Sequence, residues 1–186
     1  MRIIAGTYGG RVWHPPKGLP VRPTTDRTRE ALFNLLQSRL HMRGADVLDL
    51  FSGTGGISLE CMSRGAASVV AVDRHRGCVK ALQTALKTLG APPVVKTVQR
   101  DVRKYVKEVN TAFDFIFLDP PYDMPAQADL VETLIKRGSL KPEGILVLEH
   151  RSSTDYAHLE GFVEVRKYGD SSLSFFTKKS EDGPIQ

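Results

Sequence analysis

The sequence predicts an α/β fold in which an open, mainly parallel β-sheet is flanked by helices and closed by an antiparallel hairpin. The chain has 186 residues, of which 41% are hydrophobic, and this is enough for one well-buried core. Strand-like and helical segments alternate after residue 45, and several strand-like runs are apolar on both faces. This pattern is typical of a parallel sheet that helices cover on both sides.

The N-terminal residues predict a small extension that precedes the main domain. Ile3–Ala5 and Arg11–Trp13 flank a Gly-rich stretch and indicate a short β-hairpin, and a proline-rich connector follows over 14–23. Leucines then recur at helical spacing and predict a helix over 26–40. Its candidate N-caps are Thr24, Thr25 and Asp26.

Seven runs have the character of β-strands. Five of them alternate with helical segments and are expected to be parallel: 46–51, 68–73, 94–99, 113–118 and 145–150. Two more, 162–168 and 173–177, flank a short turn and predict an antiparallel hairpin. We therefore expect an extension over 1–24, a main domain over 25–178 and a mobile polar tail over 179–186.

Basic residues gather at the N-terminal end of the sequence. The whole chain has a formal charge of +5, whereas residues 1–43 alone hold eight Lys or Arg residues against Asp26 and Glu30. The basic excess is therefore entirely N-terminal. A phosphate backbone would favour this distribution, because steering and counterion release depend on local charge. A charged face that only keeps the protein in solution is the alternative interpretation.

Candidate ligand-binding residues follow the ends of predicted strands, where open parallel sheets bind ligands. In the stretch 49–56, Gly53 and Gly55 allow a tight turn and a close approach of backbone to ligand. Asp73 ends the next strand, near the spacing of an acid that binds a ribose. Asp101 follows the third strand, where a carboxylate can accept from the exocyclic amine of an adenine.

The fourth strand ends in Asp119-Pro120-Pro121-Tyr122. Each of these features also has a simpler explanation. The two glycines can form a strand-to-helix turn without a ligand, Asp73 and Asp101 can cap helices, and Asp and Pro are common turn residues. Their joint position at the ends of four strands favours one shared crevice.

The acidic residue beside the glycine turn indicates which nucleotide-like ligand this crevice binds. Asp49 would repel a pyrophosphate, and the full G-x-G-x-x-G pattern of dinucleotide sites is not present. An ammonium near Asp49, a ribose on Asp73 and an adenine amine near Asp101 instead describe S-adenosylmethionine.

Four stretches make a resemblance specific: R-I-I-A-G-x-x-x-G-R at 2–11, R-P-T-T-D-R-T-R-E-A-L-F at 22–33, D-L-F-S-G-T-G at 49–55 and L-D-P-P-Y at 118–122. In this order they resemble the bacterial 16S ribosomal RNA guanine-N2 methyltransferase family (RsmD-like), which belongs to the class I S-adenosylmethionine-dependent methyltransferases. The resemblance runs from Arg2 to about Arg151. It implies a Rossmann-like, seven-stranded fold and methyl transfer to the N2 amine of one guanine. The implied partner is 16S ribosomal RNA, or the assembling small ribosomal subunit.

The resemblance also implies roles for individual residues. Asp119 and Pro120 would accept the two N–H bonds of the target amine, with Pro121 and Tyr122 completing the catalytic turn. The expected cofactor site comprises Asp49, Phe51, Ser52, Gly53, Gly55, Asp73, Arg74, Asp101 and Val102. The expected RNA contacts are Arg2, Arg11, Trp13, Lys17, Arg22, Arg27 and Arg29. Two alternatives stay open here: Trp13 can pack the hairpin onto the body, and 22–30 can be a charged helix start.

Other activities and sites are less well supported. D-P-P-Y also occurs in DNA adenine-N6 methyltransferases, but the chain has no room for a large target-recognition region. A non-catalytic RNA-binding assembly factor with the same fold is the third possibility. Cys61 and Cys78 lack metal-ligand spacing and are expected to be reduced packing residues. No signal peptide or apolar run of about 18 residues is present, so we expect a soluble, cytoplasmic, monomeric protein without a metal.

Overall fold

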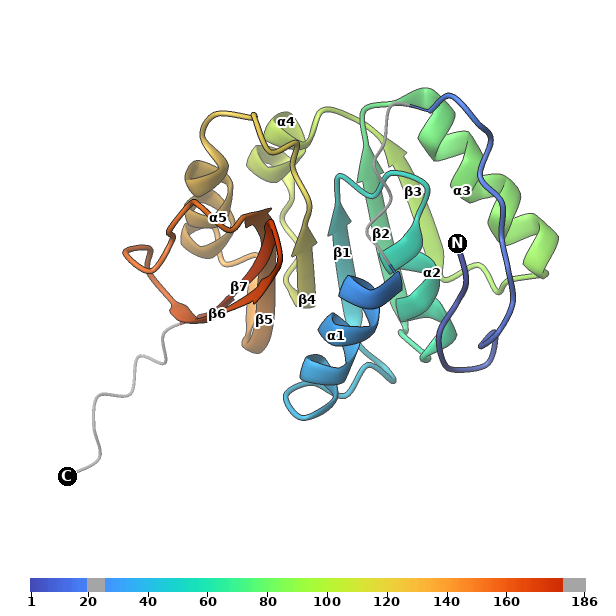
Figure 1. The fold of residues 1–186 in the computed structure, drawn as a ribbon, viewed down its shortest axis with the longest axis horizontal. Helices are drawn as coiled ribbons and strands as arrows, with labels where there is room; N and C mark the ends of the chain where they lie inside the picture. The colour runs from blue at the N-terminus through green and yellow to red at the C-terminus, as the bar shows by residue number, and fades with distance from the viewer. Residues whose placement is uncertain (20–25, 179–186) are drawn as a thin grey trace.

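The computed structural model describes residues 1–19 and 26–178, in which seven strands form one sheet (Figure 1). The strands are Asp46–Leu50 (β1), Ser68–Asp73 (β2), Val95–Gln99 (β3), Phe113–Leu118 (β4), Leu140–Arg151 (β5), Phe162–Tyr168 (β6) and Ser171–Thr177 (β7). Their order across the sheet is β3-β2-β1-β4-β5-β7-β6. Neighbours are parallel from β3 to β5, and β7 is antiparallel to both β5 and β6. The predicted fold class is confirmed.

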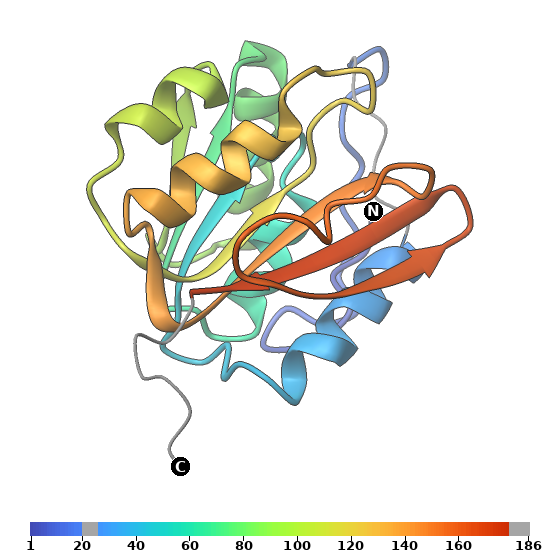
Figure 2. The same ribbon diagram turned by 90° about the vertical axis from the view of Figure 1, so that its left-hand side faces the viewer.

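Helices cover both faces of this sheet. They are Asp26–Gln37 (α1), Gly56–Ser63 (α2), Arg76–Leu89 (α3), Val102–Glu108 (α4) and Gln127–Lys136 (α5). In Figure 2, α4 and α5 lie on one side of the sheet and α1 lies on the other. The predicted helix over 26–40 begins as expected but ends at Gln37.

Successive residues of the central strands divide the core into two layers. Val47 of β1 is buried against Phe33 of α1 and Cys61 of α2, whereas Leu48 is buried on the opposite face with Leu130 of α5. Alternation of side chains along a strand explains the division. Because both faces are covered by apolar side chains, the central strands are hydrophobic at nearly every position, and only their carboxyl ends remain open to a ligand.

The N-terminal arm is a minimal hairpin that is fixed to α2. Arg2 and Val12 form one antiparallel bridge, which confirms the predicted pairing. The buried carboxylate of Glu60 on α2 accepts the backbone N–H of Ile4 at 2.7 Å and of Ala5 at 3.0 Å. The arm is therefore joined to the main body by charged hydrogen bonds rather than by packing alone.

Several expectations concern residues outside the described ranges: part of the proline-rich connector, the caps Thr24 and Thr25, Arg22, and the tail over 179–186. Within the described ranges, Cys61 and Cys78 are free and buried. None of the helices in these ranges is long and apolar enough to cross a membrane. The same ranges contain no group of three or more His, Cys, Asp or Glu residues placed to hold a metal ion.

Candidate active site

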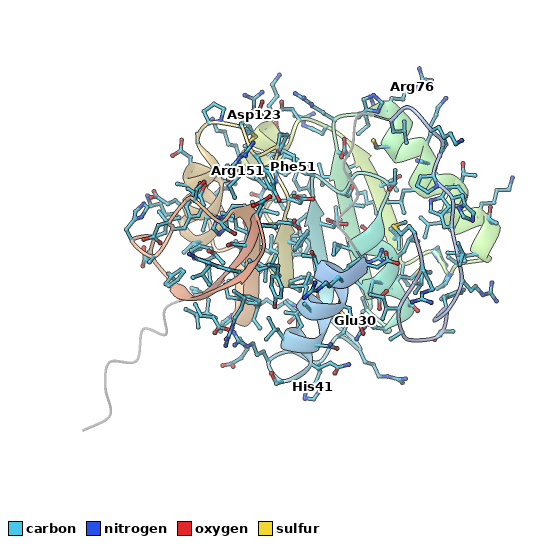
Figure 3. The ribbon with its side chains drawn as sticks, viewed as in Figure 1. Glu30, His41, Phe51, Arg76, Asp123 and Arg151 are labelled. Carbon is cyan, nitrogen blue, oxygen red and sulfur yellow. The ribbon has the colours of Figure 1, made fainter. Side chains whose placement is uncertain are left out.

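A cavity of about 760 Å³ opens at the carboxyl ends of the central strands. One acidic residue from each of four strand ends contributes to its wall: Asp49 from β1, Asp73 from β2, Asp119 from β4 and Glu149 from β5. Figure 3 shows Phe51, Asp123 and Arg151 at this end of the molecule. The structure thus brings the glycine turn and the D-P-P-Y turn to one site, as the strand order requires.

The turn after β1 is held by Asp73. The backbone N–H of Gly53 donates to Asp73 Oδ2 at 2.8 Å, and that of His75 donates to Oδ1 at 2.7 Å. Because an ionised carboxylate has about four acceptor sites, these bonds leave capacity for ribose hydroxyls. Phe51, in the same turn, has φ 62, a conformation that costs a non-glycine residue roughly 1–3 kcal/mol and clusters at ligand sites.

Asp49 is a buried acid at the base of the cavity, with a relative exposure of 1%. Its Oδ2 accepts the backbone N–H of Ser58 at 3.1 Å and also the Ser58 hydroxyl. Burial is the largest influence on its pKa and raises it to about 7, although the Ser58 hydrogen bonds oppose this and the nearby Asp73 adds to it. A cationic ligand group would favour the charged form of Asp49.

The D-P-P-Y turn is fixed from both sides. The Asp119 N–H donates to the Leu50 carbonyl at 3.3 Å, which ties the turn to β1. The Pro121 carbonyl accepts from the Met124 N–H at 2.9 Å and from Gln127 Nε2 at 3.0 Å. Tyr122 lines the cavity, and the Arg151 guanidinium lies over its ring, 5.2 Å from the centroid. Proline rings and hydrogen bonds together hold this turn in one conformation.

Three expected cofactor residues are not among those that line the cavity. Asp101 caps α4 by accepting the Arg103 N–H at 2.9 Å, and hydrogen bonding to the Arg103 side chain lowers its pKa to about 2. The contacts of Asp101 are therefore those of a helix N-cap, which is the alternative explanation that the sequence left open. Asp101 and its neighbour Val102 are not among the residues that line the cavity. Gly55 is not a lining residue either: a Cβ there would stand 2.3 Å from Leu82 Cδ1, so its glycine permits helix packing.

The expected RNA contacts divide into exposed and buried residues. Arg2, Arg11 and Lys17 are exposed on the arm, and Arg27 lines the cavity. The expected RNA contact of Arg29 needs correction. Its guanidinium is 1% exposed and donates to the Arg2 carbonyl and to Asp26.

Burial lowers the pKa of Arg29 below its ordinary value. Trp13 packs against the cluster formed by the arm, α2 and α3, so its observed contacts are those of a residue that packs the hairpin onto the body. Arg22 lies outside the described residues.

Some cavity residues were not singled out from the sequence. Glu149 near the end of β5, the turn between β6 and β7 over 167–171, Met1 and Thr28 all contribute to the wall. The signal for Glu149 was available in the pattern of strand ends: it is the acidic residue at the end of the fifth parallel strand. The hairpin turn carries no motif and enters the site only because β7 pairs with β5.

Comparison with known proteins agrees with this geometry. A family described as conserved hypothetical protein 95 matches residues 1–177. YlbH of Bacillus subtilis is 31% identical over 185 residues, which are 96% of this chain and all of YlbH. The ribosomal RNA small subunit methyltransferase D of Escherichia coli is 32% identical over 149 residues, covering 80% of this chain and 74% of that protein.

A solved structure with the same fold contains bound ligands. It is a Thermus thermophilus 16S rRNA N2 methyltransferase in complex with S-adenosylmethionine and guanosine. It is 26% identical to this chain, with a TM-score of 0.68, and the match covers 87% of this chain and 46% of that one. Both the family match and these relatives lead to one assignment: the chain belongs to the conserved hypothetical protein 95 family, that of the ribosomal RNA small subunit methyltransferase D-like methyltransferases.

Proposed function

We propose that this protein transfers a methyl group from S-adenosylmethionine to the exocyclic N2 amine of a guanine in small-subunit ribosomal RNA during ribosome assembly. The observation that carries the proposal is the shared cavity: the acidic glycine turn and the Asp119 turn line the same 760 Å³ space. The names of the relatives support ribosomal RNA as the substrate, and the guanosine complex supports guanine as the target base.

The residues of the glycine turn fit the cofactor. Asp49 is a buried acceptor for an ammonium, Asp73 is held at the end of β2 for a ribose, and Phe51, Ser52 and Gly53 form the wall between them. Arg74 also lines this part of the cavity. When bound, S-adenosylmethionine supplies an electrophilic methyl carbon on a positively charged sulfur.

The D-P-P-Y turn positions the amine that accepts the methyl group. The guanine N2 lone pair is delocalised into the ring, and a carboxylate, whose reference pKa in water is about 3.9, is in general too weak a base to deprotonate such an amine beforehand. The Asp119 carboxylate and the Pro120 carbonyl instead accept the two N–H bonds, which turns the lone pair toward the methyl carbon. The proton leaves during or after transfer, to Asp119 or to water.

Tyr122 and the basic arm hold the RNA. The Tyr122 ring offers a surface on which the extruded base stacks, worth roughly 1–3 kcal/mol, which offsets part of the cost of unstacking it. Arg2, Arg11 and Lys17 contact phosphates from the exposed arm, and Arg27 does so from the rim of the cavity. On this proposal, residues 1–24 serve as an RNA-contacting extension of the catalytic domain over 25–178, and the enzyme acts as a cytoplasmic monomer.

A labelled-methyl assay tests the activity. The enzyme is offered naked ribosomal RNA, a partly assembled small subunit, a mature small subunit and duplex DNA, and the products are digested to nucleosides. We expect N2-methylguanosine from at least one of the RNA substrates and no product from duplex DNA. N6-methyladenosine as the sole product would replace the proposal by a DNA-type adenine methyltransferase, and cofactor binding without any product would favour a non-catalytic assembly factor.

The role of Asp119 is tested by Asp119→Ala. We expect turnover to fall on the order of 100-fold or more, because the amine loses an acceptor that orients it, while calorimetry shows nearly unchanged cofactor affinity. The matched control is Asp123→Ala, an exposed acid on the same loop, which should leave turnover within about twofold. Unchanged turnover in Asp119→Ala would remove Asp119 from the proposed role.

A further inference from the structure

Glu149 occupies a position next to the catalytic turn that the mechanism has not yet used. Leu118 of β4 pairs in register with Leu148 of β5, so Asp119 and Glu149 are the next residues on two adjacent parallel chains. Neighbouring strands lie about 4.8 Å apart, and residues at the same register point to the same face of a sheet. Both residues line the cavity, so the site has two carboxyl groups at the ends of adjacent strands.

The Glu149 side chain is held in place rather than free to turn to solvent. Its relative exposure is 6%, and the Ser171 hydroxyl donates to its Oε1 at 2.9 Å. Ser171 begins β7, and Glu149 itself pairs with Leu173 of that strand. The C-terminal hairpin therefore orients this carboxylate against the cavity, which explains why its turn forms part of the wall.

The chemistry of the bases indicates what such a second acceptor recognises. In guanine, the ring atom N1 next to the exocyclic amine carries a hydrogen and is a donor. In adenine and cytosine, the corresponding ring nitrogen next to the amine is an acceptor, which a carboxylate would repel. A carboxylate beside the group that binds the amine therefore accepts a hydrogen bond from guanine alone.

We propose that Glu149 is a specificity-determining residue that accepts the N1–H of the target guanine while Asp119 and Pro120 bind its N2 amine. The inference rests on the proposed function and adds to it the residue that separates guanine from the adenine that other D-P-P-Y enzymes methylate. A site built to bind a substrate N–H rejects analogues that lack it, because its buried polar group is then left unsatisfied.

The test changes the target base in the RNA as well as the residue in the protein. 2-Aminopurine keeps the N2 amine of guanine but has no hydrogen on N1, so it presents an acceptor where guanine presents a donor. RNA carrying guanine or 2-aminopurine at the mapped position is compared in the substrate form, naked or assembled, that the labelled-methyl assay identifies. For the unmodified enzyme we expect kcat/KM to favour guanine on the order of 10- to 100-fold, the scale of one charged hydrogen bond.

The protein variant is Glu149→Gln, which keeps the shape of the side chain. The amide oxygen can still accept the Ser171 hydroxyl, so the NH2 group faces the base and repels N1–H but donates to N1 of 2-aminopurine. We expect the guanine preference to fall to about one or to reverse. The missing O6 of 2-aminopurine affects both enzymes alike, so a change in the ratio reports on the contact at N1.

Controls separate this inference from folding and from the proposed function. Glu143→Gln, an exposed change near the other end of β5, should leave the ratio unchanged. If Glu149→Gln does not fold, Ser171→Ala removes the hydroxyl that orients the carboxylate, and it should lower the ratio in the same direction. Equal use of both RNAs by the unmodified enzyme, or equal losses on both RNAs in the variant, would overturn the inference. Absence of N2-methylguanosine would instead overturn the proposed function.

Discussion

Asp49 combines a buried position with a pKa that is raised to about 7. Desolvation is the main cause, so the charged form is disfavoured while no cation is present. The folded chain therefore binds this proton more tightly than the unfolded chain, whose ordinary carboxyl pKa is about 3.9. Stability of the cofactor-free protein is consequently lost as the pH rises from about 4 through 7.

The same residue predicts a pH-dependent cofactor affinity. Because an ammonium favours ionised Asp49, binding should release a proton below pH 7, and the affinity should rise about tenfold between pH 6 and pH 8 as the ionised fraction of Asp49 rises. Calorimetry in two buffers of different ionisation enthalpy measures the released proton. Asp49→Asn should bind more weakly and lose the proton release; a variant that retains it would exclude Asp49 as its source.

At the scale of helices and strands, Gly55 at the start of α2 leaves room for the Leu82 side chain of α3. Gly55 has φ +87, and an added Cβ would stand 2.3 Å from Leu82 Cδ1 on α3. Gly55→Ala should therefore lower the free energy of unfolding by roughly 2–5 kcal/mol, through backbone strain and overpacking together. Gly90→Ala is the matched control, because Gly90 has φ +61 but no atom within 4 Å of an added Cβ.

The control should lose only about 1–2 kcal/mol from backbone strain. Urea unfolding of both variants measures the difference. Equal losses of unfolding free energy in the two variants would show that the Leu82 side chain accommodates the added methyl group without cost.

The attachment of the N-terminal arm to α2 is a second feature at the scale of helices and strands, and Glu60 contributes to it. Its carboxylate accepts the N–H groups of Ile4 and Ala5, and it pairs with Arg64 at 2.8 Å. Glu60→Ala should leave these donors unsatisfied at a cost of about 1–3 kcal/mol each and loosen this part of the arm. Hydrogen exchange at Ile4 and Ala5 should then accelerate on the order of tenfold or more.

Glu132→Ala provides the comparison, since Glu132 is in an exposed ion pair with Lys136 on α5. That variant should change stability by less than about 0.5 kcal/mol and leave the exchange of the arm unaltered. Slow exchange at Ile4 and Ala5 in Glu60→Ala would mean that the other contacts of the arm, including its hydrogen bonds to Ser63 and Arg29, are enough to fix it.

For the molecule as a whole, the uneven distribution of charge predicts the salt dependence of RNA binding. Arg11 and Lys17 are exposed on the arm, whereas Lys104 and Lys107 are exposed on α4, which covers the opposite face of the sheet. If Arg11 and Lys17 each contact a phosphate, Arg11→Ala with Lys17→Ala should reduce the slope of log K against log salt by about 1.5. Lys104→Ala with Lys107→Ala should leave the slope unchanged, and equal effects of the two pairs would contradict an RNA-binding arm.

The strands could be predicted from the sequence because the signals for a strand are local. Apolar runs and alternating segments predict every strand, and acidic residues at strand ends, such as Asp73 and Asp119, predict where the cavity lies. The strand ends converge because parallel strands share one carboxyl edge, which is a property of the fold class rather than of any one residue.

Contacts between distant segments were not accessible in the same way. Arg29 looks like a phosphate-binding residue, but its guanidinium is buried where the arm crosses α1. Gly55 looks like a ligand-approach glycine, but it makes room for Leu82. Glu149 stands near a predicted strand end, but only the register of β4 and β5 places it next to Asp119. In each case the deciding partner lies far away in the sequence.

The antiparallel insertion at one side of the sheet has a consequence for synthesis of the protein. β7 lies between β5 and β6, although it follows both along the chain. Until residues 171–177 leave the ribosome, the nascent polypeptide therefore exposes unpaired backbone N–H and C=O groups along residues 145–151 of β5, a template for pairing with other chains. Premature termination before Ser171 would thus yield an aggregation-prone protein with an unpaired strand edge rather than a slightly shorter enzyme.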